Sequence, residues 1–305
     1  MVNARDIAIG IRERLEYAKS GLRDFWTVYK TNNAAVAGLV MLIVIVGIAI
    51  FAPLIAPYDP YARVGAPMEP PSLEHWLGTN DLGQDIFSEL IYGSRVSLFI
   101  GFIAALVATL IGTVIGLVAG YFGGVIDEVL MRVTDIWLSI PTLLFTIFLA
   151  ATLMRTPLGG RILYSIIIAI AITAWPTVAR LVRSMTLSIK ERLYVEAARA
   201  VGAGDAHIML KHILPNTAPV ILVTVITRIA IAMLTEAGLS FLGLGDPTAK
   251  SWGMIIHYAM IRNAIVLGMW WWYIPPGLMI SLTVLSILLI GLGVEEYLNP
   301  RLRRR

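Results

Sequence analysis

The sequence contains no cysteine among its 305 residues. Disulfide frameworks, thiolate metal sites and cysteine nucleophiles are therefore all excluded. Charged residues are also scarce, at 14% of the chain, whereas a soluble domain carries about a quarter. With so few charges, the chain has little with which to coat a water-facing surface.

What the chain has instead is apolar sequence, at 58% of residues, with a mean hydropathy of +0.79. This composition indicates a polytopic membrane protein whose surroundings are a lipid bilayer. The calculated pI of 9.4 does not point to nucleic acid, because the basic residues cluster beside apolar segments, as topology signals do. The first thirty residues are charged throughout, so no cleavable signal peptide is expected.

Long apolar segments divide the chain. A membrane-spanning helix needs about 20 apolar residues. Six segments qualify, and they predict an all-α fold with six transmembrane helices, at 34–56, 94–120, 128–154, 162–182, 217–241 and 271–293. The expected organisation is an N-terminal arm (1–33), a first transmembrane helix (34–56), a proline-rich loop (57–93), a transmembrane domain (94–294) and a basic tail (295–305).

The distribution of basic residues sets the expected orientation. Lysine and arginine gather in the arm, in the tail and between the fourth and fifth spans, whereas loop 57–93 has only Arg63 against six acidic residues. The positive-inside rule places the arm, the tail and residues 183–216 in the cytoplasm of a multi-pass plasma-membrane protein, and loop 57–93 outside. Two short loops disagree: 121–124 has no basic residue, and Arg155 and Arg161 fall on the outer side.

Loop 57–93 contains five closely spaced prolines, so it is predicted to be irregular. Its length makes it a candidate for docking or gating, although a passive surface loop is an equal alternative. In the second span, Gly112, Gly116 and Gly120 recur every four residues. They predict a smooth helix face for close packing rather than a ligand site.

Charges within the spans need partners. Glu128, Arg132 and Asp135 are spaced to lie along one helix side and to neutralise one another, which favours a structural network over a role in transport. Arg228 and Glu236 lie about 12 Å apart on one helix, too far for direct pairing. Each is therefore expected to meet a polar neighbour, a second subunit or water in a passage.

A polar stretch interrupts the apolar sequence between the fourth and fifth spans. Residues 188–201 favour a helix, Gly202 and Gly204 permit the positive backbone angles that end one, and Asp205 suits the N-cap of a second short helix that ends at Pro215. The result is a predicted helical hairpin. Its small, apolar and charged residues suit a partner's groove. DNA binding is disfavoured, because the hairpin lies between two membrane spans.

Specific motifs refine this reading. The stretch Glu196-Ala197-Ala198, followed by Gly202 and Leu214-Pro215, resembles the EAA loop of permease subunits in ATP-binding-cassette importers. The general pattern has isoleucine where this chain has His212. The form KHILPN, with LGTNDLGQDIFSELIYGSRVSLFIG, DEVLMRVTDIWLSIPTLLF, LTEAGLSFLGLG, SWGMII, PPGLMI and LNPRLR in order, is similar to the dipeptide, oligopeptide and nickel branch. Residues 20–70 resemble the extra N-terminal region of its second permease type.

The resemblance implies a type I importer fold (MetI-like) in which one extra helix precedes a core of five. It also implies four kinds of partner: a second homologous permease, two cytoplasmic ATP-binding subunits, an external substrate-binding protein and the bilayer. The hairpin at 188–216 would dock into an ATPase. Its expected coupling residues are Glu196, Ala197, Ala198, Gly202, Leu214 and Pro215.

On this resemblance the chain is a transport subunit without a cofactor, not an enzyme. Peptide is the first choice of substrate, with oligosaccharide or nickel as alternatives. The run GLGDPTAKS at 243–251 has no glycine before Lys250, so it does not match a phosphate-binding loop. The four histidines form no metal cluster in the sequence, and His207 and His212, five apart, should share a helix face poorly. A stand-alone secondary transporter or an intramembrane enzyme would need internal repeats or a paired catalytic constellation, and neither is evident.

Overall fold

The computed structural model describes residues 23–156 and 162–298. Within these two ranges the chain forms helices and no strand, apart from one isolated bridge between Thr79 and Asp85. The elements are α2 (Asn33–Ile50), α3 (Ala52–Ile55), α4 (Ile86–Phe122), α5 (Gly124–Ser139), α6 (Thr142–Leu153), α7 (Ile162–Lys190), α8 (Leu193–Ala200), α9 (Asp205–Ile208), η2 (Met209–Ile213), α10 (Leu214–Leu239), η3 (Ser240–Leu244), α11 (Trp252–Ile261) and α12 (Trp270–Leu298).

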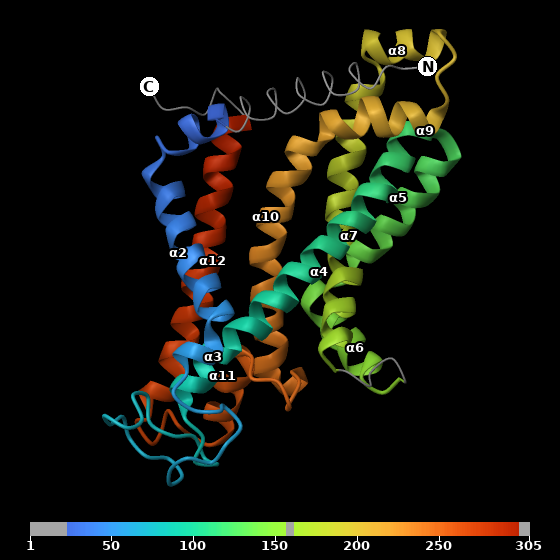
Figure 1. The fold of residues 1–305 in the computed structure, drawn as a ribbon. Helices are drawn as coiled ribbons and strands as arrows, with labels where there is room; N and C mark the ends of the chain where they lie inside the picture. Colours follow the sequence, from blue (N-terminus) through green and yellow to red (C-terminus); the bar gives the residue numbers. More distant parts are fainter. Residues whose placement is uncertain (1–22, 157–161, 299–305) are drawn as a thin grey trace, which may run out of the picture.

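The helices form an elongated bundle with two distinct ends (Figure 1). Helices α2 and α12 run side by side, α10 lies next to them, and α4 crosses the bundle to pack along α7. We call the end that carries α8 and α9 the hairpin end. The opposite end, which carries residues 56–85 and α11, is the loop end. The start of α2 and the end of α12 both lie at the hairpin end (Figure 1).

Within the described residues, five helices are long and apolar enough to cross a membrane, or six if α5 and α6 count as one span. The span expected over 128–154 is broken in two, because α5 and α6 meet at a bend of 92°. Ile140 has an extended backbone between the two helices, and Pro141 follows it. Proline lacks the N–H that a continuing helix needs, and it disfavours helical geometry in the residue before it.

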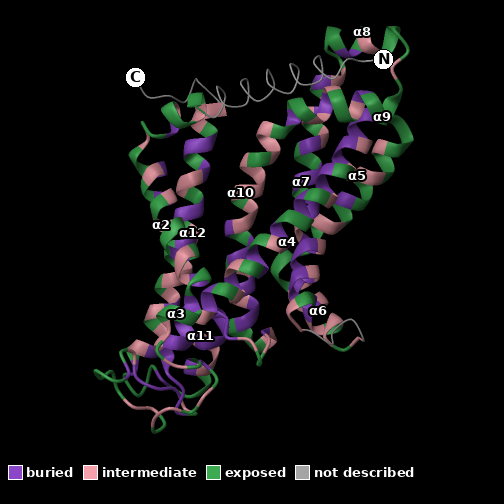
Figure 2. Ribbon diagram, in the orientation of Figure 1, coloured by how far each residue is buried: buried purple, intermediate pink, exposed green. Residues whose placement is uncertain are grey.

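Close packing of α4 against α7 confirms the predicted glycine strip. A Cβ atom at Gly112 would lie 2.6 Å from the Val178 Cβ, and one at Gly116 would lie 2.5 Å from the Ala179 carbonyl oxygen. Such distances leave no room for any side chain, so these glycines allow the two backbones to approach. Buried residues accordingly follow the α4–α7 contact, while the outer faces of α2 and α12 are largely exposed (Figure 2).

The second span begins earlier than residue 94, where it was expected. Helix α4 starts at Ile86, so the proline-rich segment ends at Asp85. Asp85 caps this helix: its carboxylate accepts hydrogen bonds from the backbone N–H of Ser88 at 2.8 Å and from the Ser88 hydroxyl at 2.7 Å. An aspartate N-cap with Glu89 in the first turn is a recognised helix start.

The predicted network of Glu128, Arg132 and Asp135 is also wrong. Asp135 pairs with Arg180 of α7, and no ion pair forms between Glu128 and Arg132 in the described part of the chain. About two turns earlier on α5, Asp127 pairs with Arg183 of α7, with an N–O distance of 2.5 Å. The acidic residues of α5 therefore attach it to α7. Asp135 pairs with an arginine of α7 rather than with Arg132 of its own helix, because α5 lies along α7.

Candidate functional site

Where the sequence predicts a hairpin, the chain forms two short helical segments joined by a turn, and the second segment differs from expectation. Helix α7 ends at Lys190, α8 follows, and Gly202 turns the chain with a φ of +85°. Gly204 has a negative φ and an extended backbone, so only Gly202 needs the left-handed conformation. Asp205 is the first residue of α9 rather than a side-chain N-cap.

The second arm does not end at Pro215. Helical backbone continues from Asp205 through the π-helical turn η2 into α10, where Pro215 lies in the first turn. The missing N–H of a proline does no harm in a first turn, and the wider η2 turn adjusts the backbone just before it. The hairpin therefore joins the transmembrane helix α10 without a flexible break.

Three buried aliphatic side chains anchor the hairpin to the bundle. Val195 of α8, Ile208 of α9 and Ile213 of η2 are fully buried. They pack in one cluster with side chains that include Tyr121 of α4 and Ile189 of α7. Burying each aliphatic side chain contributes roughly 1.5–3 kcal/mol, so the hairpin is held as part of the bundle.

Polar contacts add to this anchor. The Tyr121 hydroxyl donates a hydrogen bond of 2.6 Å to the Asp205 carboxylate. The Arg199 guanidinium lies 5.9 Å from the centre of the Tyr121 ring, in the range of a cation–π contact. One residue at the end of α4 therefore contacts both arms of the hairpin, a contact that no sequence pattern indicates.

The predicted coupling residues lie mostly on the outside of the hairpin. Glu196, Ala197, Gly202 and Pro215 are exposed, whereas Ala198 and Leu214 are partly buried. No atom lies within 4 Å of a Cβ placed at Gly202. The structure also exposes two large aliphatic residues beside them, with Leu193 82% and Val201 85% exposed. The outer face is therefore small, partly apolar and open.

His207 and His212 lie closer together than expected, with ring centres 5.7 Å apart. The physical reason is η2, since a π-helical turn brings residues i and i+5 to the same side. Among the described residues no group of three histidine, aspartate or glutamate side chains has the arrangement of a metal site. The two histidines are therefore interpreted as part of the hairpin surface and not as a metal site.

Glu236 and Arg228 occupy different environments on α10. The Glu236 side chain is buried and accepts a 2.8 Å hydrogen bond from the Ser240 hydroxyl, so its partner is a polar neighbour. Arg228 is partly buried and lines a cavity with five threonines. No hydrogen bond or ion pair links the Arg228 guanidinium to another side chain of the described ranges.

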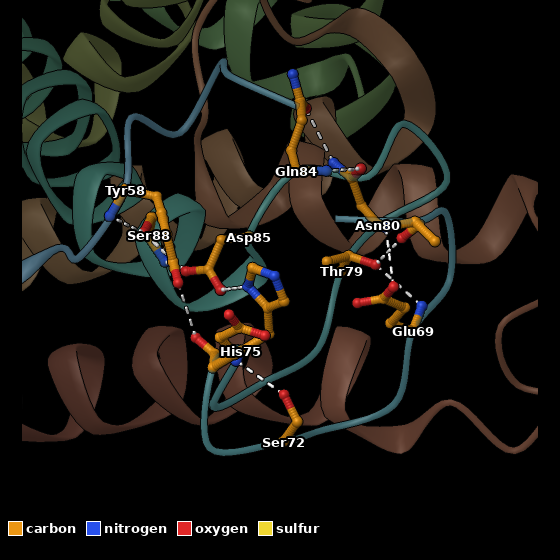
Figure 3. Close-up of polar contacts among 11 residues, drawn as sticks. Tyr58, Glu69, Ser72, His75, Thr79, Asn80, Gln84, Asp85 and Ser88 are labelled. Atoms are coloured by element: carbon orange, nitrogen blue, oxygen red, sulfur yellow. Dashed lines mark hydrogen bonds and ion pairs between the residues drawn. The ribbon is translucent and has the colours of Figure 1, made fainter. Parts of the chain in front are cut away.

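At the loop end, the proline-rich segment is folded by side-chain hydrogen bonds (Figure 3). The ring of His75 lies 3.0 Å from the Asp85 carboxylate, and both side chains are buried. The backbone N–H of Tyr58 donates to the Ser88 hydroxyl at 3.2 Å. These contacts hold both ends of the segment against the start of α4.

A second polar cluster joins this segment to α4 and to the residues before α11. The Lys250 ammonium donates to Glu89 at 2.6 Å and to Gln84 at 2.7 Å. The Asn80 amide donates to the same two oxygens, at 2.8 Å and 2.9 Å. Lys250 is thus held in a buried ion pair within the chain, which is not the environment of a phosphate ligand.

Comparisons with known proteins agree with this architecture. Residues 112–304 match the family described as binding-protein-dependent transport system inner membrane component, and residues 20–71 match the N-terminal TM domain of oligopeptide transport permease C. The oligopeptide transport system permease protein OppC of Bacillus subtilis (strain 168) is 39% identical over 279 residues, which cover 90% of this chain and 88% of that protein.

Two further relatives are similar over comparable lengths. The dipeptide transport system permease protein DppC of Bacillus subtilis (strain 168) is 38% identical over 284 residues, covering 92% of this chain and 86% of that protein. The glutathione transport system permease protein GsiD of Escherichia coli O157:H7 is 38% identical over 283 residues, covering 92% and 90%. The chain therefore belongs to the binding-protein-dependent transport system inner membrane components, as a permease of the peptide branch of ATP-binding-cassette importers.

Proposed function

We propose that this permease forms the path by which an ATP-driven importer carries a peptide-type substrate delivered by an external binding protein. The printed names of the three relatives, which refer to oligopeptide, dipeptide and glutathione transport, support a peptide over an oligosaccharide or nickel. The permease itself is a transport component and not an enzyme, so ATP is hydrolysed on separate subunits.

The observation that carries the coupling proposal is the combination of a firmly anchored hairpin with an open outer face. Val195 and Ile208 are fully buried beneath it, while Glu196 and Ala197 are exposed on it. A force applied to such an element passes to the helices with which it is packed. We infer that residues 188–216 seat in an ATPase subunit, with Gly202 setting the turn and Glu196 making a directed polar contact.

The proposed orientation follows from charge and from the two ends of the bundle. The hairpin end carries most of the basic residues between the fourth and fifth spans, so it is assigned to the cytoplasm with both termini. The loop end is assigned to the outside, where its folded segment would face the binding protein. The complete assembly would contain a second homologous permease and two ATPases.

Arg228 and Glu236 receive separate roles in this proposal. Glu236 is enclosed beside Ser240 and supports packing between α10 and its neighbours. Arg228 remains partly exposed in a cavity and is the better candidate for contact with a substrate in passage. A charge that faces a cavity at membrane depth is a functional candidate by default.

The absence of native cysteine allows a direct test of coupling. A single Ala198→Cys substitution, with a short crosslinker that joins a thiol to a lysine amine and the coexpressed complex, should yield a product between the permease and an ATPase subunit. Thr227→Cys, which is exposed on a transmembrane helix away from the hairpin, is the matched control. An Ala198→Cys variant that assembles but never crosslinks to the ATPase would contradict the proposal.

A functional test uses Glu196→Lys and Gly202→Val. Both variants should insert into the membrane, whereas uptake should fall relative to ATP hydrolysis, because the docking contact or its turn is altered. Valine strongly disfavours the φ of +85° at residue 202. Normal uptake with normal ATPase association in both variants would refute the assignment. Uptake of labelled peptide, compared with oligosaccharide and nickel, tests the substrate class.

A further inference from the structure

Arg228 opens into a small cavity between α4, α6, α7 and α10. Alanine, leucine and isoleucine form most of its wall, so water competes little for the polar groups that face the cavity. The cavity lies near the middle of the proposed span, since Arg228 is 14 residues beyond Leu214, the start of α10, or about 21 Å along the helix. Its polar lining consists of Thr142, Thr146, Thr173, Thr177, Arg228 and Thr235.

Other arginines of the helices have a partner on a neighbouring helix, whereas the Arg228 side chain has none in the described ranges. Arg183 pairs with Asp127 and Arg180 with Asp135, and the Arg95 guanidinium donates to the Ala49 carbonyl at 2.8 Å. For Arg228 the described ranges provide no such partner, and none of the residues lining its cavity is acidic. An unpaired guanidinium in an apolar environment favours an anion.

The threonine hydroxyls complement this charge. The Thr146 hydroxyl lies 2.9 Å from the Thr173 hydroxyl, so these two threonines bond to each other. Thr177 and Thr235 each donate their hydroxyl proton to a carbonyl of their own helix, at 3.1 and 2.9 Å respectively. Their remaining oxygen lone pairs can only accept hydrogen bonds. The cavity therefore offers one cationic donor beside several acceptors, a combination that suits a carboxylate attached to N–H groups.

The bent span contributes to the same site. Thr142 is the first residue of α6 and lines the cavity, and the preceding Pro141 provides no side-chain cap for this helix. The N-terminus of a helix carries partial positive charge from its unpaired N–H groups. The sharp turn between α5 and α6 thus places a second source of positive potential beside Arg228.

We propose that the Arg228 cavity binds the carboxylate of a peptide as the peptide passes through the permease, while the threonine oxygens accept hydrogen bonds from its N–H groups. This inference rests on the proposed import of peptides and names the part of the substrate that the path recognises. A neutral oligosaccharide offers Arg228 no anionic group. A nickel dication would be repelled by the guanidinium and would find no acidic ligand in the lining.

The test uses the complete complex in proteoliposomes with its own binding protein. Initial uptake of a labelled tripeptide is compared with uptake of the same tripeptide as its C-terminal amide, for the wild type, Arg228→Gln, Arg228→Lys and the control Thr227→Val. Each variant's rate is divided by the wild-type rate for the same peptide, so the preference of the unchanged binding protein cancels.

Arg228→Gln should lower uptake of the free acid about tenfold, the effect of losing one charged contact, and should change uptake of the amide less than twofold. Arg228→Lys should retain part of the preference, and Thr227→Val all of it. Equal losses for acid and amide, or no loss for either, would overturn the inference. A wild-type complex that imports neither peptide would instead overturn the proposed function, and this inference with it.

A second measurement requires no transport. Thr235→Cys places a single thiol in the cavity. When each labelling rate is divided by the same reagent's rate with a free thiol in solution, an anionic methanethiosulfonate should label it several-fold faster than a cationic one of similar size. Adding Arg228→Gln should abolish that preference. Equal labelling rates in the single variant would show that the cavity does not attract anions and would refute the proposal.

Discussion

The Lys250 ammonium lies 2.6 Å from the Glu89 carboxylate, although the two residues are 161 positions apart in the sequence. Glu89 belongs to the first turn of α4, and Lys250 precedes α11. Both side chains are buried, and Gln84 and Asn80 complete their hydrogen bonds. This pair joins the folded segment at the loop end to two separate parts of the bundle.

Removing one member of this pair should destabilise the protein strongly. Lys250→Met leaves the Glu89 charge buried without its partner, which costs roughly 3–5 kcal/mol in comparable buried pairs. The expected result is a lower apparent melting temperature in detergent and faster proteolysis of residues 58–85. The double variant Lys250→Met with Glu89→Gln should recover much of the loss, because no unpaired charge remains.

The matched comparison is the Arg262–Asp81 pair, in which the arginine side chain is 51% exposed. Arg262→Gln should cost only about 0–1 kcal/mol, as is usual for exposed pairs. If Lys250→Met and Arg262→Gln lowered the melting temperature equally, burial would not be what makes the Lys250 pair important.

Close contact between α4 and α7 predicts a sharp difference between two glycines. Gly116→Ala places a Cβ 2.5 Å from the Ala179 carbonyl oxygen, so the helices must separate. We expect a loss of roughly 1–3 kcal/mol, typical of overpacking. Gly47→Ala is the control, because nothing lies within 4 Å of its Cβ position. Thermal unfolding in detergent should show a loss for residue 116 only, and equal effects would contradict the packing argument.

The sequence predicted local features better than long-range ones. The spacing of Gly112, Gly116 and Gly120 was sufficient to identify a packing face, because helical periodicity is local. Pro141 could have predicted the bend between α5 and α6, and the Asp85 cap could have placed the start of α4. The expected boundaries of the spans followed the continuous apolar composition instead of these two signals.

Contacts between distant residues were not predictable in this way. Nothing in the sequence around Lys250 identifies Glu89 as its partner, and the threonines around Arg228 come from three helices. Asp135 was paired with the wrong residue for the same reason, since spacing alone favoured Arg132 over Arg180 of a neighbouring helix. Likewise, the approach of His207 to His212 depends on a π-helical turn that periodicity does not reveal.

The contact between Tyr121 and Asp205 predicts how firmly the hairpin is held. Tyr121→Phe removes the hydroxyl that donates to Asp205 at 2.6 Å. Because Asp205 is exposed and regains water, the loss should be about 1 kcal/mol. Amide hydrogen exchange should accelerate several-fold over 205–213. Tyr164→Phe is the control, since this residue is 44% exposed and its hydroxyl has no hydrogen bond in the described structure. Unchanged exchange in Tyr121→Phe would refute this role.

Serine substitutions at exposed and buried positions of α8 and the following Val201 should have different effects. Leu193→Ser and Val201→Ser alter side chains that are 82% and 85% exposed, so the permease should keep its melting temperature. If the hairpin seats in an ATPase, each variant loses part of the roughly 1.5–3 kcal/mol that burial of such a side chain supplies, and ATPase affinity should fall about tenfold.

Val195→Ser, at a fully buried position, should instead lower the melting temperature. Titration of detergent-solubilised permease with purified ATPase separates the two effects. Unchanged affinity in both surface variants would show that the apolar part of this face takes no part in docking.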